Sequence, residues 1–208
     1  MFDKTQFTHK IFSKESWEDE VKKMILSLNI NDGVLWYKKH KSLKKINEEL
    51  VTLGYYTKYK YFKENAVSFY LNQEQGKIDG YICQNGCIIE TVQIVIAFYD
   101  KEESQRDINL TAGQNTTECG WVGEKLNFIK NRIIDRVNLK IGKCYKDIDT
   151  LLIGVRDWFV SRISKDEYAV FGNEVRKHVS NLNSTHNFKQ IVIVDTDYVG
   201  KGSYIAFP

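Results

Sequence analysis

Two acidic residues flank a predicted hairpin turn near the middle of the chain. Asp79 precedes and Glu90 follows the dipeptide Asn85-Gly86, which separates two runs rich in strand-forming residues. Asn-Gly between such runs predicts a two-residue hairpin. In a regular register Tyr81 opposes Glu90 and Asp79 opposes Val92, and directly opposed or alternate residues share one face of a sheet. We therefore expect Asp79 and Glu90 to be diagonal neighbours on one face, with Cα atoms roughly 7–8 Å apart.

Two carboxylates at this separation are able to bind one divalent cation, because Mg²⁺ and Mn²⁺ prefer oxygen ligands. The neighbouring side chains are mostly apolar, among them Ile78, Ile82 and Ile89, and an unpaired charge is costly in such surroundings. A lysine or arginine partner would satisfy the carboxylates equally well, and an aspartate at the beginning of a strand can also face solvent. The residues alone leave a metal site and structural ion pairs as open alternatives.

Apolar spacing and turn residues predict the elements that must position this hairpin. Ser16 begins a first helix with Asp19 as its capping-box partner, and Gly54 ends a second helix that begins at Ser42. The expected helices cover residues 16–31, 42–53, 121–143 and 158–163, and residues 167–179 either continue the last of these or form another helix. The expected strands cover residues 66–71, 77–84, 87–99, 150–155, 191–194 and 203–207. Strands that first follow one another and then alternate with helices predict an α/β fold, a mixed central sheet flanked by helices on both faces. The polar segment 100–120 is long enough to suggest a functional loop.

Composition narrows the class of protein. With 208 residues, 42% of them hydrophobic, and a single proline at the last position, the chain is expected to form one domain. The absence of a secretory signal and the irregular spacing of four cysteines favour a cytoplasmic protein over a disulfide scaffold. The longest apolar run, residues 88–99, is too short and too polar for a bilayer span, so we expect no membrane partner.

Basic residues gather on the long helix and among the tyrosines of the N-terminal half. The expected helix over residues 121–143 carries Lys125, Lys130, Arg132, Arg136, Lys140 and Lys143 against only Glu124 and Asp135. The N-terminal half interleaves Lys38, Lys39, Lys41, Lys44, Lys45, Lys58, Lys60 and Lys63 with Tyr37, Tyr55, Tyr56, Tyr59 and Tyr61. Such mixtures suit phosphate contacts and base stacking, although a solvated surface or half-buried strand tyrosines would explain them too. The net charge of +3 neither requires nor excludes nucleic acid.

The order of elements and the two acidic motifs resemble the core of the PD-(D/E)XK nuclease-like superfamily, which is also described as restriction-endonuclease-like. This core has the order αβββαβ, with one carboxylate on its second strand and another on its third. Ile78-Asp79-Gly80 and Ile88-Ile89-Glu90 resemble these two positions. The resemblance implies a single domain over residues 1–208, with residues 1–40 as an N-terminal helical extension, 42–156 as the nuclease-like core, and 157–208 as an added helix and strands.

The resemblance also implies a set of site residues. In the superfamily a lysine lies two residues after the second acid, where this chain has Val92. Gln93 is a substitute if a bulge brings it to the required face, and Lys140 of the long helix is another. Glu49 on the first core helix is the expected third acid. The implied catalytic residues are Asp79, Glu90, Gln93 and Lys140, and the implied ligands of Mg²⁺ or Mn²⁺ are Asp79, Glu90 and Glu49.

Three functions remain as expectations. The resemblance implies a metal-dependent endonuclease that hydrolyses phosphodiester bonds in DNA. Val92 at the lysine position suits the alternative, a catalytically inactive nuclease-like domain that binds nucleic acid or a protein partner. A protein-interaction module without a nucleic-acid role, or a homodimer, is compatible with the same residues.

Overall fold

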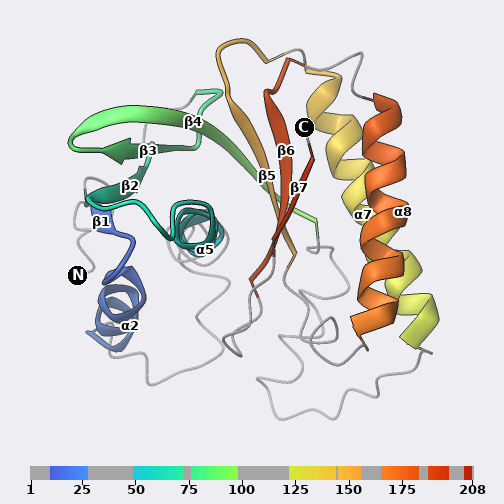
Figure 1. The fold of residues 1–208 in the computed structure, drawn as a ribbon, viewed down its shortest axis with the longest axis horizontal. Helices are drawn as coiled ribbons and strands as arrows, with labels where there is room; N and C mark the ends of the chain where they lie inside the picture. The colour runs from blue at the N-terminus through green and yellow to red at the C-terminus, as the bar shows by residue number, and fades with distance from the viewer. Residues whose placement is uncertain are drawn as a thin grey trace.

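A seven-stranded mixed sheet runs through the computed structural model of the chain, with helices on both of its faces (Figure 1). The structure describes residues 10–27, 49–72, 76–97, 122–143, 145–155, 165–182, 187–196 and 204–207. The sheet and the placement of helices confirm the predicted α/β class. The predicted helix over residues 158–163, the long polar segment 100–120 and most of the basic N-terminal run lie outside the described residues.

The strands lie side by side in the order of the sequence. They are β1 (Phe12–Ser13), β2 (Val67–Leu71), β3 (Gly80–Gln84), β4 (Cys87–Ile96), β5 (Thr150–Val155), β6 (Gln190–Asp195) and β7 (Tyr204–Phe207). The pairs from β1 to β4 are antiparallel, β4–β5 and β5–β6 are parallel, and β6–β7 is antiparallel. Only β1 was not expected from the sequence, because two residues are too few to show an alternating pattern.

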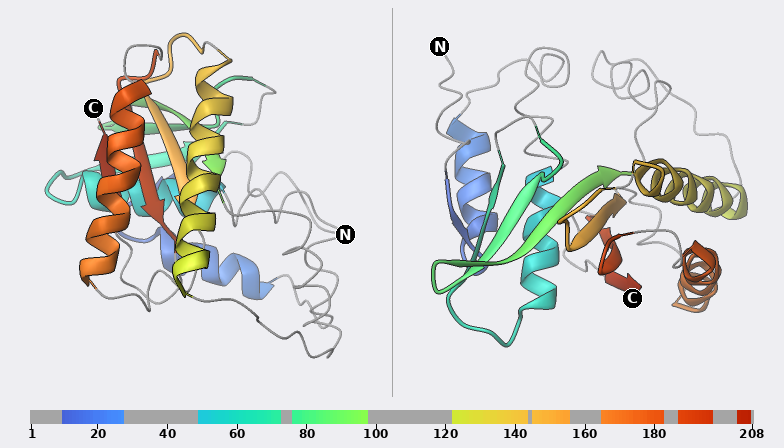
Figure 2. Two further views of the ribbon diagram at one scale, coloured as in Figure 1. Left: turned by 90° about the vertical axis from the view of Figure 1, so that its right-hand side faces the viewer. Right: turned by 90° about the horizontal axis from the view of Figure 1, so that it is seen from above.

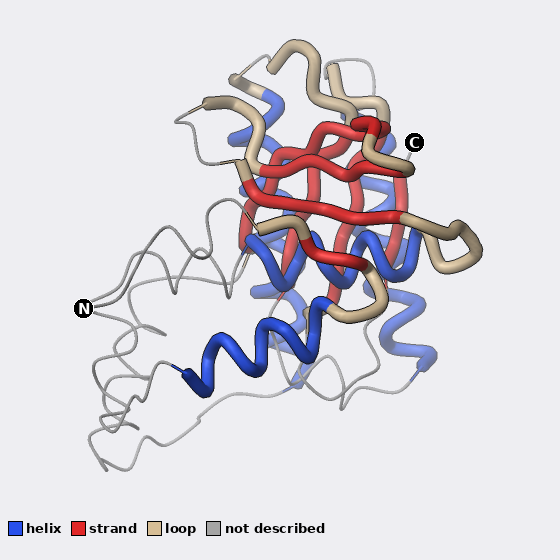
Figure 3. The backbone as a smooth tube through the Cα atoms, turned by 90° about the vertical axis from the view of Figure 1, so that its left-hand side faces the viewer, coloured by secondary structure: helices blue, strands red, loops and turns tan. Residues whose placement is uncertain are grey.

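The described helices pack on opposite faces of this sheet. Helices α2 (Trp17–Ser27) and α5 (Val51–Lys60) lie on one face, and α7 (Val122–Ile141) and α8 (Lys165–Leu182) lie on the other (Figures 1 and 2). Helix α5 contacts β2, β5 and β6, so the sheet curves around it, whereas α7 contacts β5 and α8 contacts β7. Figure 3 views the molecule from the α2 and α5 side. Among the described residues, none of the helices combines the length and apolar character needed to cross a bilayer.

Each face of the sheet has its own apolar core, which follows the two-residue period of the strands. Ile82, Val92, Ile94 and Leu152 point toward α5 and pack with Leu53. On the opposite face, side chains of β5 and β6 pack with α7 and α8; this second core contains Ile129, Ile133, Val137, Leu151, Ile153, Val175, Val179, Ile191 and Ile193. Residues 150–155 are buried throughout, as expected for a central strand covered on both sides.

Helix α5 continues through Gly54, which was expected to end it. The helix runs from Val51 to Lys60, so the predicted end is wrong, and the predicted beginning lies outside the described residues. A Cβ atom at Gly54 would lie 2.7 Å from the indole ring of Trp17 in α2. Gly54 is therefore needed for the close approach of two helices, and its lack of a side chain does not mark a helix end.

Helix α2 begins where the sequence predicts. Its first residue is Trp17, directly after Ser16, and the Ser16 hydroxyl donates a hydrogen bond of 2.5 Å to Glu20. The side-chain partner of Ser16 is therefore Glu20, four positions on, and not the expected Asp19.

The β3–β4 hairpin has the predicted turn but not the predicted register. Asn85 and Gly86 both have positive φ, at 51° and 81°, which is the geometry of a type I′ turn. Gln84 pairs with Cys87 as expected, but the register then shifts, and Ile82 pairs with Glu90. The extra residue Ile89 forms a bulge, which reverses the faces of all residues of β4 beyond it relative to β3.

The bulge matches the packing of α5 on the sheet. A Cβ atom at Gly80 would lie 2.7 Å from Leu53 Cδ2, so the helix requires a glycine on this face of β3. The observed register places Gly80 and Ile82 beneath α5 and turns Tyr81 to the opposite face. In the regular register the bulky Tyr81 would lie against α5 instead.

Gly154 of β5 offers a test of the contact between α5 and the sheet. A Cβ atom there would lie 2.5 Å from Thr52 Oγ1 and 2.6 Å from Ile96 Cδ1. We expect Gly154→Ala to lower the free energy of unfolding by about 1–3 kcal/mol through overpacking. The matched control is Gly142→Ala, where the nearest atom would lie at 3.4 Å and stability should change by less than about 0.5 kcal/mol. Equal denaturation midpoints for the two variants would contradict this account of the contact.

Candidate functional site

Asp79 lies at the point where β3 begins. Its backbone N–H donates to the Val92 carbonyl at 2.9 Å, and its carbonyl accepts from the Asn72 N–H at 2.8 Å. Its half-buried carboxylate reaches along β4, where Oδ2 accepts hydrogen bonds from the Ile94 backbone N–H at 2.8 Å and from the Gln93 side-chain amide. Asp79 is thus oriented by backbone on both neighbouring strands and by one buried side chain.

Gln93 lies on the same face of the sheet as Asp79. A residue that replaces the missing lysine must lie on this face. Its side chain is 4% exposed, and it lies one residue after Val92, which points into the core beneath α5. A bulge was expected to be necessary between Glu90 and Gln93. The observed bulge lies before Glu90, at Ile89, and it leaves Gln93 beside Asp79 while turning Glu90 away.

Lys140, in the last turn of α7, lies near Asp79. Burial lowers the pKa of the Lys140 ammonium, and so do Lys143 and Arg136, while the carboxylates of Asp79 and Glu49 act in the opposite direction. Asp79 and Glu49 therefore each lie within electrostatic range of Lys140. Three segments far apart in the sequence contribute to this neighbourhood.

Tyr145 is a neighbour of this group that sequence reasoning missed. The Lys140 ammonium lies 5.5 Å from the centre of its ring, a cation–π distance. Burial, and secondarily the negative charge of Asp79, raise the pKa of the Tyr145 hydroxyl. We call Asp79, Gln93, Lys140, Tyr145 and Glu49 the Asp79 group.

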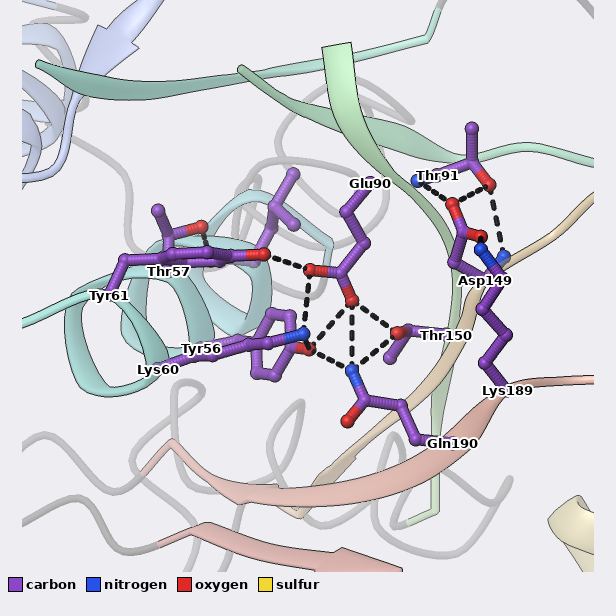
Figure 4. A network of polar contacts seen from close by, with 11 residues as sticks. Tyr56, Thr57, Lys60, Tyr61, Glu90, Thr91, Asp149, Thr150, Lys189 and Gln190 are labelled. Carbon is purple, nitrogen blue, oxygen red and sulfur yellow. Dashed lines mark hydrogen bonds and ion pairs between the residues drawn. The ribbon is translucent and has the colours of Figure 1, made fainter. Parts of the chain in front are cut away.

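Glu90 belongs to a different set of contacts on the α5 face (Figure 4). Its Oε1 accepts hydrogen bonds from the Tyr56 hydroxyl at 2.7 Å, from the Gln190 amide at 3.0 Å, and from the Thr150 hydroxyl. Its Oε2 accepts from the Tyr61 hydroxyl at 2.6 Å and from the Lys60 ammonium at 3.0 Å. We call Glu90 and these donors the Glu90 network; the donors come from α5 and the turn after it, and from β5 and β6.

The donors of the Glu90 network use all the hydrogen-bond acceptor positions of this carboxylate. An ionised carboxylate has about four lone-pair positions, and Glu90 meets donors from five side chains. Its side chain is 3% exposed. Burial by itself raises the pKa of Glu90, but the hydrogen bonds from Thr150 and Tyr61 and the charge of Lys60 outweigh it and lower the pKa. The arrangement stabilises a buried anion and leaves no position for a metal ion.

A second carboxylate borders the Glu90 network at the beginning of β5 (Figure 4). Asp149 accepts from the Thr91 backbone N–H and hydroxyl, both at 2.9 Å. It also forms an ion pair of 2.5 Å with Lys189. The pKa of Asp149 is lowered because these contacts outweigh its partial burial. They connect β4 with the residues directly before β5 and β6.

The predicted pairing of Asp79 with Glu90 in one metal site is therefore wrong. Glu90 points toward α5, whereas Asp79 contacts Gln93 on the face covered by α7. Of the other expected site residues, Gln93 donates a hydrogen bond to Asp79, and Lys140 lies within electrostatic range of Asp79 and, separately, of Glu49. Within the described part of the chain, no cluster of three or more histidine, cysteine, aspartate or glutamate side chains is arranged to bind a metal ion.

From the sequence, Tyr56, Lys60 and Tyr61 were candidates for nucleic-acid contacts, with a solvated surface or half-buried tyrosines as alternatives. In the structure all three donate to Glu90. The spacing of Tyr56 and Lys60, four residues apart, would have placed both on one side of a helix. The glycine at position 54 hides this signal, because glycine in a helical pattern predicts a helix end. The donors Thr150 and Gln190 had no local signal, since each begins an apolar strand.

Comparisons with protein-family models, with curated proteins and with solved structures give no match for this chain.

The Glu90 network predicts a large effect of removing one charge. Glu90→Gln replaces an acceptor oxygen by an amide that donates toward groups which are themselves donors. We expect it to lower the free energy of unfolding at neutral pH by about 3–5 kcal/mol. Because the folded pKa of Glu90 is lowered, this contribution is complete above the unfolded carboxyl pKa of about 4.3 and is lost as the pH falls through the folded value. The difference between wild type and variant should therefore narrow under acidic conditions.

Denaturation curves between neutral and acidic pH measure this effect. The control is Glu174→Gln, which changes a side chain that is 52% exposed and ion-paired at the surface, and which should alter stability by less than about 0.5 kcal/mol. If Glu90→Gln were as stable as the control at neutral pH, the network would not stabilise the fold.

Proposed function

We propose that this chain is a nuclease-like domain that hydrolyses phosphodiester bonds in DNA with a divalent cation held at the Asp79 group. The observation that carries the proposal is that Asp79, at the start of β3, accepts a hydrogen bond from Gln93 and lies within electrostatic range of Lys140, which is also in range of Glu49. The order α5, β2, β3, β4, α7, β5 supports it, because it agrees with the αβββαβ order of the PD-(D/E)XK core.

The donor set of the Asp79 group fits Mg²⁺ or Mn²⁺. Mg²⁺ is usually bound by one or two carboxylates and retains several waters, and Asp79 and Glu49 supply two carboxylates. Bound there, the ion would supply an activated water and stabilise negative charge on the phosphate. Glu90 is left out of this set because its oxygens already accept hydrogen bonds from five side chains.

The remaining residues of the Asp79 group have positioning roles in this proposal. The Gln93 amide and the Ile94 N–H hold the Asp79 carboxylate in one orientation. Lys140 contributes a positive charge for a phosphate oxygen, and its ammonium is held over the ring of Tyr145. Positive charge held in position favours the negatively charged transition state of phosphodiester cleavage.

A second candidate function is a nuclease-like domain that binds nucleic acid without cleaving it. Two observations favour this alternative. Val92, which occupies the position of the superfamily lysine, is fully buried in the core beneath α5. Glu90, the expected second metal ligand, faces away from Asp79 and stabilises the fold instead.

Cleavage of supercoiled plasmid and of single-stranded DNA with Mg²⁺ or Mn²⁺ tests the proposal. We expect Asp79→Asn and Glu49→Gln to abolish cleavage, because each removes one ligand charge, and Lys140→Met to slow it on the order of 10²-fold or more. Calorimetry should show weaker Mn²⁺ binding for the two carboxylate variants. Glu174→Gln, a surface change on α8, should cut DNA like the wild type.

The outcomes separate the two candidate functions. Equal cutting by wild type and Asp79→Asn would remove the proposed site. DNA binding that falls steeply with salt, combined with no cleavage in either metal, would select the second candidate.

A further inference from the structure

Four basic residues form a stripe along α7 and the turn that follows it. Arg132, Arg136, Lys140 and Lys143 are separated by four, four and three positions, a spacing that places side chains one above another on a helix. Lys143 continues the stripe because its N–H still bonds to the Lys140 carbonyl, at 3.2 Å. At 1.5 Å per residue the stripe is roughly 16 Å long.

The stripe lies on the flank of α7 that faces away from α8. Arg132 and Arg136 each precede a buried core residue, Ile133 and Val137, by one position. Lys130 instead follows the core residue Ile129 and forms an ion pair of 2.6 Å with Glu174 of α8. Because successive residues turn by about 100° around a helix, positions before and after a core residue lie on opposite flanks.

The C-terminal end of the stripe meets the Asp79 group. Lys140 belongs to both, and its ammonium is affected by the opposite charges of Asp79 and Glu49 and by the like charges of Arg136 and Lys143. The stripe therefore leads along the helix directly to the carboxylate on which the proposed site is built.

We propose that this stripe binds consecutive phosphates of duplex DNA and guides the strand to Asp79. Consecutive phosphates of one strand of duplex DNA lie closer together than the length of the stripe, so the stripe can face more than one of them. The segment 132–143 contains no aromatic residue and only one acidic residue, Asp135. Positive charge without stacking partners suits the backbone of a duplex, whereas single-strand binding combines basic grooves with aromatic side chains.

That the stripe guides the DNA strand to Asp79 rests on the proposed function, but binding of duplex DNA to the stripe can be tested separately from catalysis. Fluorescence anisotropy with a 20-bp duplex, in EDTA and between 50 and 200 mM salt, measures binding without cleavage; each phosphate contact contributes about −0.9 to the slope of log K against log salt. We expect the triple variant R132Q/R136Q/K143Q, which leaves Lys140 intact, to reduce the slope by about 2 to 3.

The matched control is Lys130→Gln, on the same helix but on the opposite flank, which should keep the wild-type slope. If the triple variant has a lower melting temperature than the wild type, Lys143→Gln alone serves, because Lys143 is exposed and should reduce the slope by about 0.9. An unchanged slope in a folded variant, no duplex binding by the wild type at 50 mM salt, or tighter binding of a single strand than of the duplex would each overturn the inference.

The failures of the two proposals are distinguishable. A wild-type protein that binds duplex DNA through the stripe but cuts nothing would refute hydrolysis and keep the stripe. A protein that cuts DNA, and whose triple variant binds duplex with the wild-type slope, would refute the stripe and keep hydrolysis.

Discussion

One additional residue in β4 decides which side of the sheet each carboxylate faces. Side chains alternate between the two faces along a strand. The bulge at Ile89 therefore shifts the register by one residue and exchanges the faces of all β4 side chains beyond it relative to β3. Glu90 consequently points toward α5, and Asp79 and Gln93 meet on the face of α7. The close approach of α5 to Gly80 depends on the same shift. The bulge at Ile89 is therefore the reason that Glu90, which stabilises the fold, lies apart from the candidate site at Asp79.

The fold surrounds the carboxylates of Glu90 and Asp79 with different partners. Glu90 is buried and surrounded by hydroxyl, amide and ammonium donors, which hold its pKa low and connect α5 with β4, β5 and β6. Such a saturated anion stabilises one arrangement of the fold, because loss of any donor leaves a buried polar group without a partner. Asp79 is half-buried at a strand end and lies within electrostatic range of the Lys140 ammonium, on which Glu49 also acts. That mixture of charges at an incompletely covered position is typical of functional groups.

The functional proposals follow from where charge is placed. The Asp79 group combines two carboxylates and one lysine, while the basic stripe of α7 adds positive charge along a path that ends there. A nuclease requires both parts, one for the cation and one for the DNA backbone. A binding domain requires only the stripe. The same helix supplies Lys140 to both, so in these proposals the long α7 would connect DNA binding with the candidate chemistry.

Local sequence patterns determined most of the elements and the mixed sheet. The Asn85-Gly86 turn, the buried strand 150–155 and the periodic helix α7 were all predictable, because each depends on neighbouring residues. Lys140, Glu49 and Gln93 were named from the sequence only through a resemblance, and the contact of Gln93 with Asp79 and the approach of Lys140 are tertiary. The bulge, the continuation of α5 through Gly54 and the partners of Glu90 were decided by the tertiary structure alone. Their physical cause lies in contacts between distant segments: Trp17 against Gly54, Leu53 against Gly80, and Gln190 bonded to an acid one hundred positions earlier.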